Sequence, residues 1–233
     1  MTPDREQVAT NAEEIRERIA RAAARAGRRG DDVTLVGATK TVDPDRIRWA
    51  VDAGVTAMGE NYAQDLRVKR DAVPGASWHY IGTLQSGTAR LVADHADVVE
   101  TLAGERAARR LAARAARAGR TLDALIEVDL TEGRAGVPPA DAERFADLVA
   151  SLEGLRLVGV MTVPPVPKEA EDSRPYFARL RELRDALRRQ HPDVLETSMG
   201  MSLDYEVAVE EGATMVRVGT ALFGPRANRE EPT

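Results

Sequence analysis

Short apolar runs alternate with segments of helical periodicity eight times along this chain, and few folds accommodate that pattern. The runs are rich in Val, Ile and Leu, as expected of buried strands. They occupy residues 33–36, 55–58, 78–81, 97–100, 122–128, 155–160, 194–197 and 214–218. Eight strands and their helices in 233 residues predict an α/β fold, a (β/α)8 TIM barrel with an additional N-terminal helix.

An open, doubly wound sheet is the alternative fold. It is disfavoured because no Gly-x-Gly-x-x-Gly follows the first strand. The chemically interesting residues also follow strands one, two, seven and eight, which an open sheet need not bring together. We therefore expect a single barrel domain over residues 1–233, with the N-terminal helix within 1–27 and a polar tail at 227–233.

Composition excludes several classes of function. The chain has a net charge of -5 with Arg and Glu interspersed, which argues against a nucleic-acid-binding face. It has no cysteine, so disulfides, thiolate metal sites and a cysteine nucleophile are excluded. The N-terminus lacks a signal-peptide core and no apolar run could span a bilayer, so we expect a cytoplasmic protein without membrane contact.

Lys40 lies where the first strand has ended and the next helix has not begun. Asp43 is placed to cap that helix and Pro44 to be its first residue. Desolvation there would lower the pKa of a lysine, which makes its amine a nucleophile able to form a Schiff base. An ordinary surface lysine is the alternative, and this stretch alone favours that alternative.

Two later segments suit a phosphate group, which TIM barrels often hold after strands seven and eight. After strand seven, Ser198, Gly200 and Ser202 offer hydroxyls and open N–H groups, and Ser202 is predicted to cap the following helix. Gly219 and Thr220 follow strand eight, in a segment that lacks the lysine of a Walker A loop. Ordinary helix capping is the alternative for either segment alone.

Closure of a barrel places strand eight beside strand one, so Lys40 should face this phosphate cup. An amine beside a phosphate cup is what pyridoxal 5'-phosphate (PLP) requires. Arg217 falls within strand eight, where burial of its charge costs several kcal/mol. If its side chain points inward it could meet the pyridine nitrogen, and a salt bridge to the helix layer is the alternative.

The chain resembles the pyridoxal-phosphate homeostasis (YggS/PROSC) family over roughly residues 8–226. The matching stretches are Ala38-Thr-Lys40-Thr, Gly59-Glu-Asn-Tyr62, Trp78-His-Tyr-Ile-Gly82 with Leu84-Gln85, Gly159-Val-Met161-Thr-Val-Pro164, Ser198-Met-Gly-Met-Ser202 and Arg217-Val-Gly-Thr-Ala-Leu-Phe-Gly224.

This resemblance implies the fold of the alanine racemase N-terminal domain and PLP bound as a Schiff base without catalytic turnover. It implies that Lys40 carries the cofactor, that Ser202, Gly219 and Thr220 contact its phosphate and that Arg217 contacts its pyridine. Asn61 would lie beside the ring, and Met161, Ser198 and Gly200 complete the implied set. It further implies a monomer that transiently contacts PLP-dependent apo-enzymes.

One departure from the family concerns the stretch after Leu84-Gln85-Ser86. Many relatives carry Asn-Lys there, whereas this chain has Gly87-Thr88. A second lysine that some relatives use for cofactor or partner is therefore missing, which puts a transfer role for this loop in doubt.

The remaining candidates are weaker. His79 is predicted to be a hydrogen-bonded structural histidine, because no other His or Cys is placed to work with it. Glu127 and Asp129 share a strand face, which suits a carboxylate pair or a metal, but no third ligand is evident. Asp129 could equally orient the loop at 133–136.

Two enzymes remain as alternatives to a binding protein. A PLP-dependent amino-acid racemase needs a base on each face of the cofactor, and in the racemases one base comes from a second domain that we do not expect here. A phosphosugar-type barrel enzyme would need an acid–base pair beside the phosphate cup, and the sequence suggests none.

Overall fold

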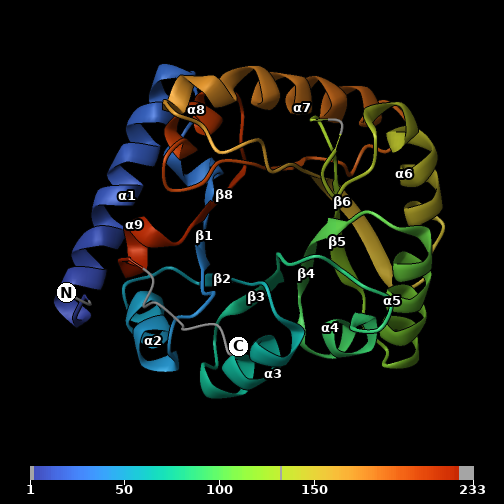
Figure 1. Ribbon diagram of the computed structural model, residues 1–233, viewed down its shortest axis with the longest axis horizontal. Coiled ribbons are helices and arrows are strands. Elements are labelled where there is room, and N and C mark those ends of the chain that lie inside the picture. The colour runs from blue at the N-terminus through green and yellow to red at the C-terminus, as the bar shows by residue number, and fades with distance from the viewer. Residues whose placement is uncertain (1–2, 132, 226–233) are drawn as a thin grey trace.

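Eight parallel strands close into a barrel in this computed structural model, which describes residues 3–131 and 133–225 (Figure 1). Each strand pairs with the next, and β8 pairs with β1 to close the ring. The strands are β1 Thr34–Ala38, β2 Ala57–Glu60, β3 Ser77–Tyr80, β4 Val98–Leu102, β5 Leu122–Glu127, β6 Leu155–Met161, β7 Glu196–Ser198 and β8 Met215–Val218. The predicted (β/α)8 barrel is therefore confirmed.

Helices surround the barrel and connect its strands (Figure 1). The α-helices are α1 Arg5–Arg25, α2 Pro44–Asp52, α3 Ala63–Ala72, α4 Ala89–His95, α5 Glu105–Arg117, α6 Ala142–Ala150, α7 Arg174–Leu187, α8 Tyr205–Glu210 and α9 Thr220–Phe223. Short 3-10 turns occupy Gly30–Asp32, Pro139–Asp141 and Ala170–Ser173. None of the described helices combines the length and apolar composition that a membrane span requires.

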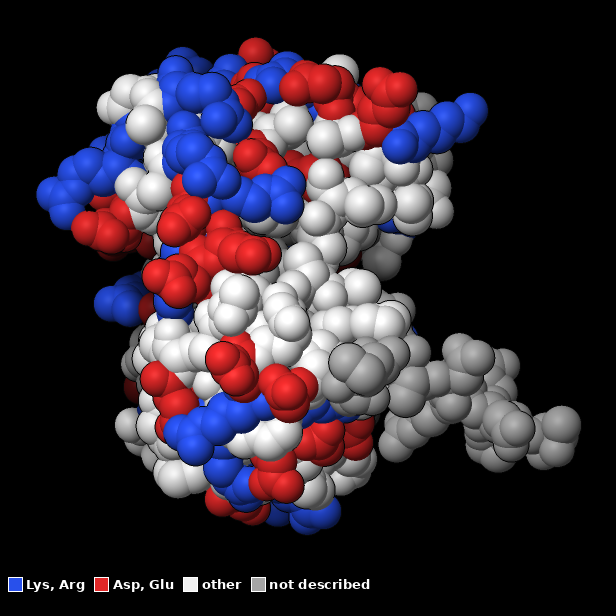
Figure 2. Space-filling model, turned by 90° about the vertical axis from the view of Figure 1, so that its left-hand side faces the viewer, with Lys and Arg blue, Asp and Glu red and all other residues white. Residues whose placement is uncertain are grey.

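The predicted N-terminal helix exists as α1 and packs along one side of the barrel (Figure 1). Its buried stripe includes Val8, Ile15 and Ile19. Ion pairs tie its outer face to α8, with Arg25 2.6 Å from Glu210. Acidic and basic side chains are mixed on this face of the molecule, as the sequence suggested (Figure 2).

Local signals explain where α2 begins. The Asp43 carboxylate accepts the N–H of Arg46 at 3.0 Å, and Pro44 is the first helical residue. Both roles were predicted, and together they fix the point at which the chain turns away from Lys40.

Several sequence predictions about element boundaries near the site are wrong, and Ser198, predicted to follow the seventh strand, is the last residue of β7. Helix α8 begins at Tyr205 with Asp204 at its N-cap position, so Ser202 does not cap it. The reason is a turn in which the Asp204 carboxylate accepts the N–H of Met201 at 2.7 Å and holds the chain out of helical geometry until residue 205. Gly59 and Glu60 lie within β2, not after it. The predicted polar tail at 227–233 lies outside the described residues.

The barrel interior is apolar in the middle and polar toward the carboxyl ends of the strands. The buried apolar cluster inside the ring consists of Val36, Ala57, Val98, Leu125, Met161 and Met215. Above it lie the polar side chains of His79, Glu100, Ser198 and Arg217. Trp78 and Tyr80 instead join the cluster that packs strands against helices. The polar groups are thus placed at the end of the barrel where ligands are usually bound.

Candidate functional site

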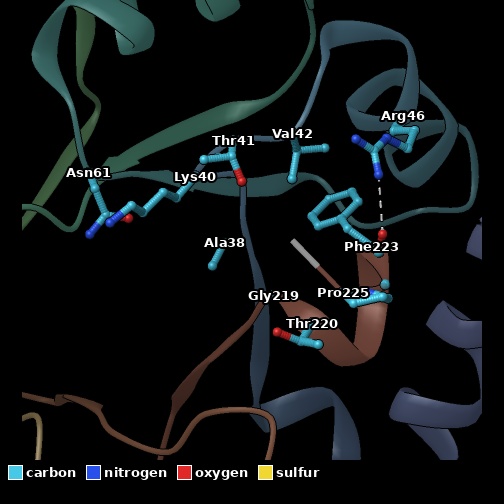
Figure 3. A pocket seen from close by; sticks show the side chains of 11 residues that line it. Ala38, Lys40, Thr41, Val42, Arg46, Asn61, Gly219, Thr220, Phe223 and Pro225 are labelled. Atoms are coloured by element: carbon cyan, nitrogen blue, oxygen red, sulfur yellow. Dashed lines mark hydrogen bonds between the residues drawn. The ribbon is translucent and has the colours of Figure 1, made fainter. Parts of the chain in front are cut away.

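A cavity opens at the carboxyl ends of β1 and β8, and it brings together residues from both ends of the chain (Figure 3). Lys40 and Asn61 line one side, and Gly219 and Thr220 line the other. The remaining lining residues are Ala38, Thr41, Val42, Arg46, Phe223, Gly224 and Pro225. Four of the residues singled out from the sequence therefore share one cavity, as closure of the barrel predicts.

Lys40 sits in a tight turn with an unusual backbone. The carbonyl of Thr39 accepts the N–H of Val42 at 2.8 Å, so Lys40 and Thr41 are the central residues of a β-turn. Thr41 has a φ of 66°, a value that a β-branched residue rarely adopts. Strain of this kind costs about 1–3 kcal/mol and persists only where the surroundings enforce it.

The Lys40 ammonium lies beside Tyr62 and extends toward Asn61. Its Nζ is 5.2 Å from the centroid of the Tyr62 ring, within the range of a cation–π contact. Figure 3 shows the Lys40 and Asn61 side chains pointing toward one another. Lys40 is half-buried, and within residues 3–131 and 133–225 its amine forms no ion pair. The amine is therefore available to a ligand in the cavity.

Asn61 is held in place by close packing of the next loop. Its backbone N–H donates to the Glu60 carboxylate at 2.7 Å. A Cβ added at Gly82 would stand 1.9 Å from the Asn61 carbonyl oxygen, so only glycine allows this approach. The glycine that ends the stretch Trp78–Gly82 thus positions a residue of the cavity.

The turn after β8 contributes Gly219 and Thr220 to the cavity lining. The carbonyl of Gly219 accepts the N–H groups of Leu222 and Phe223, which folds the short helix α9. The N–H of Ala221 donates to Ser202 Oγ at 3.3 Å. Ser202 therefore lies beside Gly219 and Thr220, although it does not cap α8 as the sequence suggested.

Gly200 acts through its backbone. Its φ is 89°, and a Cβ would stand 2.5 Å from that of Ala208. Its carbonyl accepts the N–H of Arg217 at 3.0 Å, which ties the loop after β7 to β8.

Arg217 and Ser198 lie deeper, in the polar layer inside the barrel. The guanidinium of Arg217 donates to Ser198 Oγ at 2.5 Å and to the carbonyl of Thr162 at 2.9 Å. Ser198 Oγ donates to Glu100, whose carboxylate lies 3.7 Å from Arg217. The inward orientation predicted for Arg217 is present, and the Ser198 hydroxyl is committed to this network, not to the cavity.

Burial and charge act against each other in this layer. Burial lowers the pKa of Arg217, and the charge of Glu100 opposes that shift. Burial raises the pKa of Glu100, but the hydrogen bond and charge of His79, the charge of Arg217 and the hydrogen bond from Ser198 outweigh it, so the net pKa is lowered. His79 Nδ1 lies 2.7 Å from Glu100, in agreement with the predicted structural role of this histidine.

Met161, Glu127 at the end of β5 and Asp129 just after that strand complete the set of sequence candidates. Met161 belongs to the apolar cluster inside the barrel. Burial raises the pKa of Glu127 to about 7. Asp129 accepts the N–H groups of Gly133 and Arg134 at 2.9 Å, which confirms that it orients the following loop. The described residues bring no three His, Asp or Glu side chains into a metal-binding group.

Sequence reasoning missed two buried charges beside Lys40. Glu60 was quoted only as part of a motif, and Lys69 was assigned to a polar helix. Both are nearly inaccessible, and Lys69 Nζ donates to the Glu60 carboxylate. A signal existed, because Lys69 follows the buried Ala63 and Leu66 at helical spacing on one face of α3. Arg46, which lines the cavity, was also missed.

Comparisons with known proteins agree with this geometry. Residues 4–227 match the family described as alanine racemase, N-terminal domain. The pyridoxal phosphate homeostasis protein of Aquifex aeolicus (strain VF5) is 40% identical over 217 residues, which cover 91% of this chain and 95% of that protein. The protein of the same name from Escherichia coli (strain K12) is 35% identical over 226 residues, covering 94% and 97%.

Solved structures show the same barrel. PipY of Synechococcus elongatus PCC7942 without PLP has a TM-score of 0.83 at 32% identity, covering 94% of this chain and all of that one. PipY with PLP bound has a TM-score of 0.79 at 33% identity, covering 88% of this chain. An alanine racemase of Clostridium difficile 630 shares only the fold, with 15% identity and a TM-score of 0.71 over 56% of its chain.

Proposed function

We propose that this chain, which belongs to the family of pyridoxal phosphate homeostasis proteins, binds pyridoxal 5'-phosphate in the cavity between β1 and β8. The observation that carries the proposal is the meeting of the Lys40 amine with the Gly219–Thr220 backbone in one cavity. An aldehyde-reactive amine on one side and N–H groups on the other suit the two ends of this cofactor.

The residues present fit the cofactor. A Cβ at Gly219 would come into van der Waals contact with Ala38, 3.4 Å from its carbonyl oxygen, so it would fill space between two residues that line the cavity. We propose that this space, the N–H groups of Gly219 and Thr220, and Ser202 hold the phosphate. When bound, the cofactor would supply an aldehyde, and the Lys40 amine is the group that would hold it covalently.

Arg217 is proposed to meet the pyridine nitrogen. Its contacts with Ser198 and Thr162 hold the guanidinium in a fixed place above the apolar cluster of the barrel. A guanidinium can donate a hydrogen bond to that nitrogen but does not surrender its proton to it. A neutral pyridine is a weak electron sink, which suits a protein that holds the cofactor without reacting further.

We propose that the protein buffers and delivers the cofactor and does not turn over a substrate. Among the cavity-lining residues in the described part of the chain, Lys40 is the only one whose side chain belongs to the types that commonly serve as a general acid or base. Racemisation requires a second base on the opposite face. The competing proposal of an amino-acid racemase is supported only by fold-level likeness at 15% identity. Transient contact with apo-enzymes, a monomeric state and a cytoplasmic location are further parts of this proposal.

Borohydride reduction tests the proposal directly. The chain has only three lysines, Lys40, Lys69 and Lys168, so peptide mass mapping after reduction assigns the pyridoxyl group without ambiguity. We expect the label on Lys40 and a yellow protein before reduction. A label on Lys69 or Lys168 would refute the site. Rapid Lys40-dependent interconversion of amino-acid enantiomers, followed by chiral chromatography, would refute the binding-protein function.

A further inference from the structure

Glu60 is a buried carboxylate that joins the two loops flanking Lys40. It ends β2 and is fully inaccessible. One carboxylate oxygen accepts the backbone N–H groups of Asn61 at 2.7 Å and Tyr62 at 3.1 Å. The other accepts the hydroxyl of Thr39 at 2.8 Å. A single side chain therefore holds the residue before Lys40 and the two residues beside its ammonium.

Lys69 completes this arrangement from α3. Its side chain is buried, and its Nζ donates both to the Glu60 carboxylate and to the carbonyl of Thr39 at 2.8 Å. That carbonyl is also the acceptor that closes the strained turn around Lys40 and Thr41. The ammonium of Lys69 is thus bonded directly to the backbone that carries Lys40.

We infer that the Lys69–Glu60 pair is a positioning device that holds the Lys40 amine in the orientation needed to reach a cofactor aldehyde. The inference rests on the proposed function and adds two residues to it. Neither Lys69 nor Glu60 lines the cavity, so both act through Thr39, Asn61 and Tyr62. The left-handed backbone of Thr41 is held in place because the carbonyl on one side of the turn is bonded twice.

Stability alone does not account for this pair. Burying two charges costs desolvation energy, and well-packed neutral residues at such sites are often equally or more stabilising. A neutral pair at positions 60 and 69 could fill the same space between β2 and α3. It could not place a charged donor against the Thr39 carbonyl. The particular gain of the ion pair is the geometry of the Lys40 turn.

The test compares two ligands in a paired variant. Lys69→Met combined with Glu60→Gln removes both charges together and avoids leaving one buried charge unpaired. PLP reports Schiff-base formation at Lys40 by visible absorbance. Pyridoxine 5'-phosphate carries an alcohol in place of the aldehyde and reports only the phosphate cup and ring contacts. Arg70→Met is the matched control on α3, because it breaks a partly buried ion pair with Asp97 away from the cavity.

A positioning role predicts a selective loss. The paired variant should lose about tenfold or more in apparent PLP affinity and in the rate of Schiff-base formation, with pyridoxine 5'-phosphate affinity changed less than about twofold. The Arg70→Met control should keep both affinities. Equal losses for both ligands would show a merely structural role and overturn the inference. A variant equal to the parent would overturn it too, while a parent that forms no Schiff base at Lys40 would instead refute the proposed function.

Discussion

Two buried ion pairs flank the cavity, and they differ in what they hold. Lys69 and Glu60 are in direct contact, and both form hydrogen bonds with backbone and side-chain groups around Lys40. Arg217 and Glu100 are 3.7 Å apart and share the Ser198 hydroxyl between them. Lys69 and Glu60 bond to each other and to the backbone on both sides of Lys40, so this pair fixes a loop. The Arg217–Glu100 pair is farther apart, which suits the contact that we propose between the Arg217 guanidinium and the cofactor.

Removing the Lys40 amine, which we infer the Lys69–Glu60 pair positions, should have the largest effect on cofactor binding. We expect Lys40→Ala to abolish the visible absorbance of the PLP complex while retaining the parent's circular dichroism and a free energy of unfolding within about 1 kcal/mol of the parent's. The fold survives because Lys40 is half-buried and contributes little apolar burial. A variant that remains yellow would show that another lysine carries the cofactor.

Breaking the Arg217–Glu100 pair should affect both stability and binding. Arg217→Ala removes one of the two partners of the buried Glu100 and leaves His79, so we expect a loss of about 3 kcal/mol of unfolding free energy, the lower end of the range for breaking a buried ion pair. Urea unfolding measures this loss, and cofactor retention on a desalting column should fall with it. Arg217→Glu, if it folds, should shift the absorbance spectrum because the ring nitrogen can then be protonated. A PLP-bound structure with Arg217 turned away from the ring would end its proposed role.

Glu127 provides a pH probe of the same polar layer. Its carboxyl has a folded-state pKa of about 7 against an ordinary value of 4.5, because burial disfavours the charged form. The folded state therefore binds a proton that the unfolded chain releases, and native stability falls as pH rises from about 4.5 to 7.

Glu127→Gln should remove this dependence. The free energy of unfolding of the variant minus that of the parent should rise by about 2–3 kcal/mol as the pH rises from 5 to 8, and urea unfolding measures it. Glu13→Gln on the exposed face of α1 is the control, and its free energy of unfolding relative to the parent should not change between pH 5 and pH 8. A parallel pH profile for parent and Glu127→Gln would contradict the assignment.

Releasing the strain beside Lys40 should have the smallest effect. Thr41→Gly accepts the φ of 66° without penalty. The relief of about 1–3 kcal/mol is partly offset by the greater entropy of glycine in the unfolded chain, so we expect a net gain of about 1 kcal/mol. Chemical denaturation measures it. A loss of stability would mean that the threonine side chain contributes contacts that outweigh the strain.

The barrel and the location of the cavity could be predicted because they follow from periodicity and chain order. The alternation of strands and helices predicts the fold, and closure predicts that Lys40 meets Gly219 and Thr220. Some roles were visible in the sequence because the partners are near neighbours in the chain. This holds for Asp43 and Pro44 at the start of α2 and for Asp129 in the loop that follows it.

The supporting contacts could not be predicted in the same way. Glu60 and Thr39 are 21 residues apart, and Ser198 and Glu100 are 98 apart, so only three-dimensional packing pairs them. The error at Ser202 has a local cause, since Asp204 competes for the same N-terminal role two residues later. Sequence patterns thus locate reactive groups more readily than the groups that hold them.

The pairing of β1 with β8 has a consequence for how the protein is made. The two groups proposed to hold the cofactor, the Lys40 amine and the Gly219 backbone, are far apart in the sequence. During synthesis on the ribosome, one edge of β1 stays unpaired until β8 has emerged. On the proposed function, the binding site therefore forms late, and a cofactor bound across the β1–β8 seam would stabilise the closed ring by mass action.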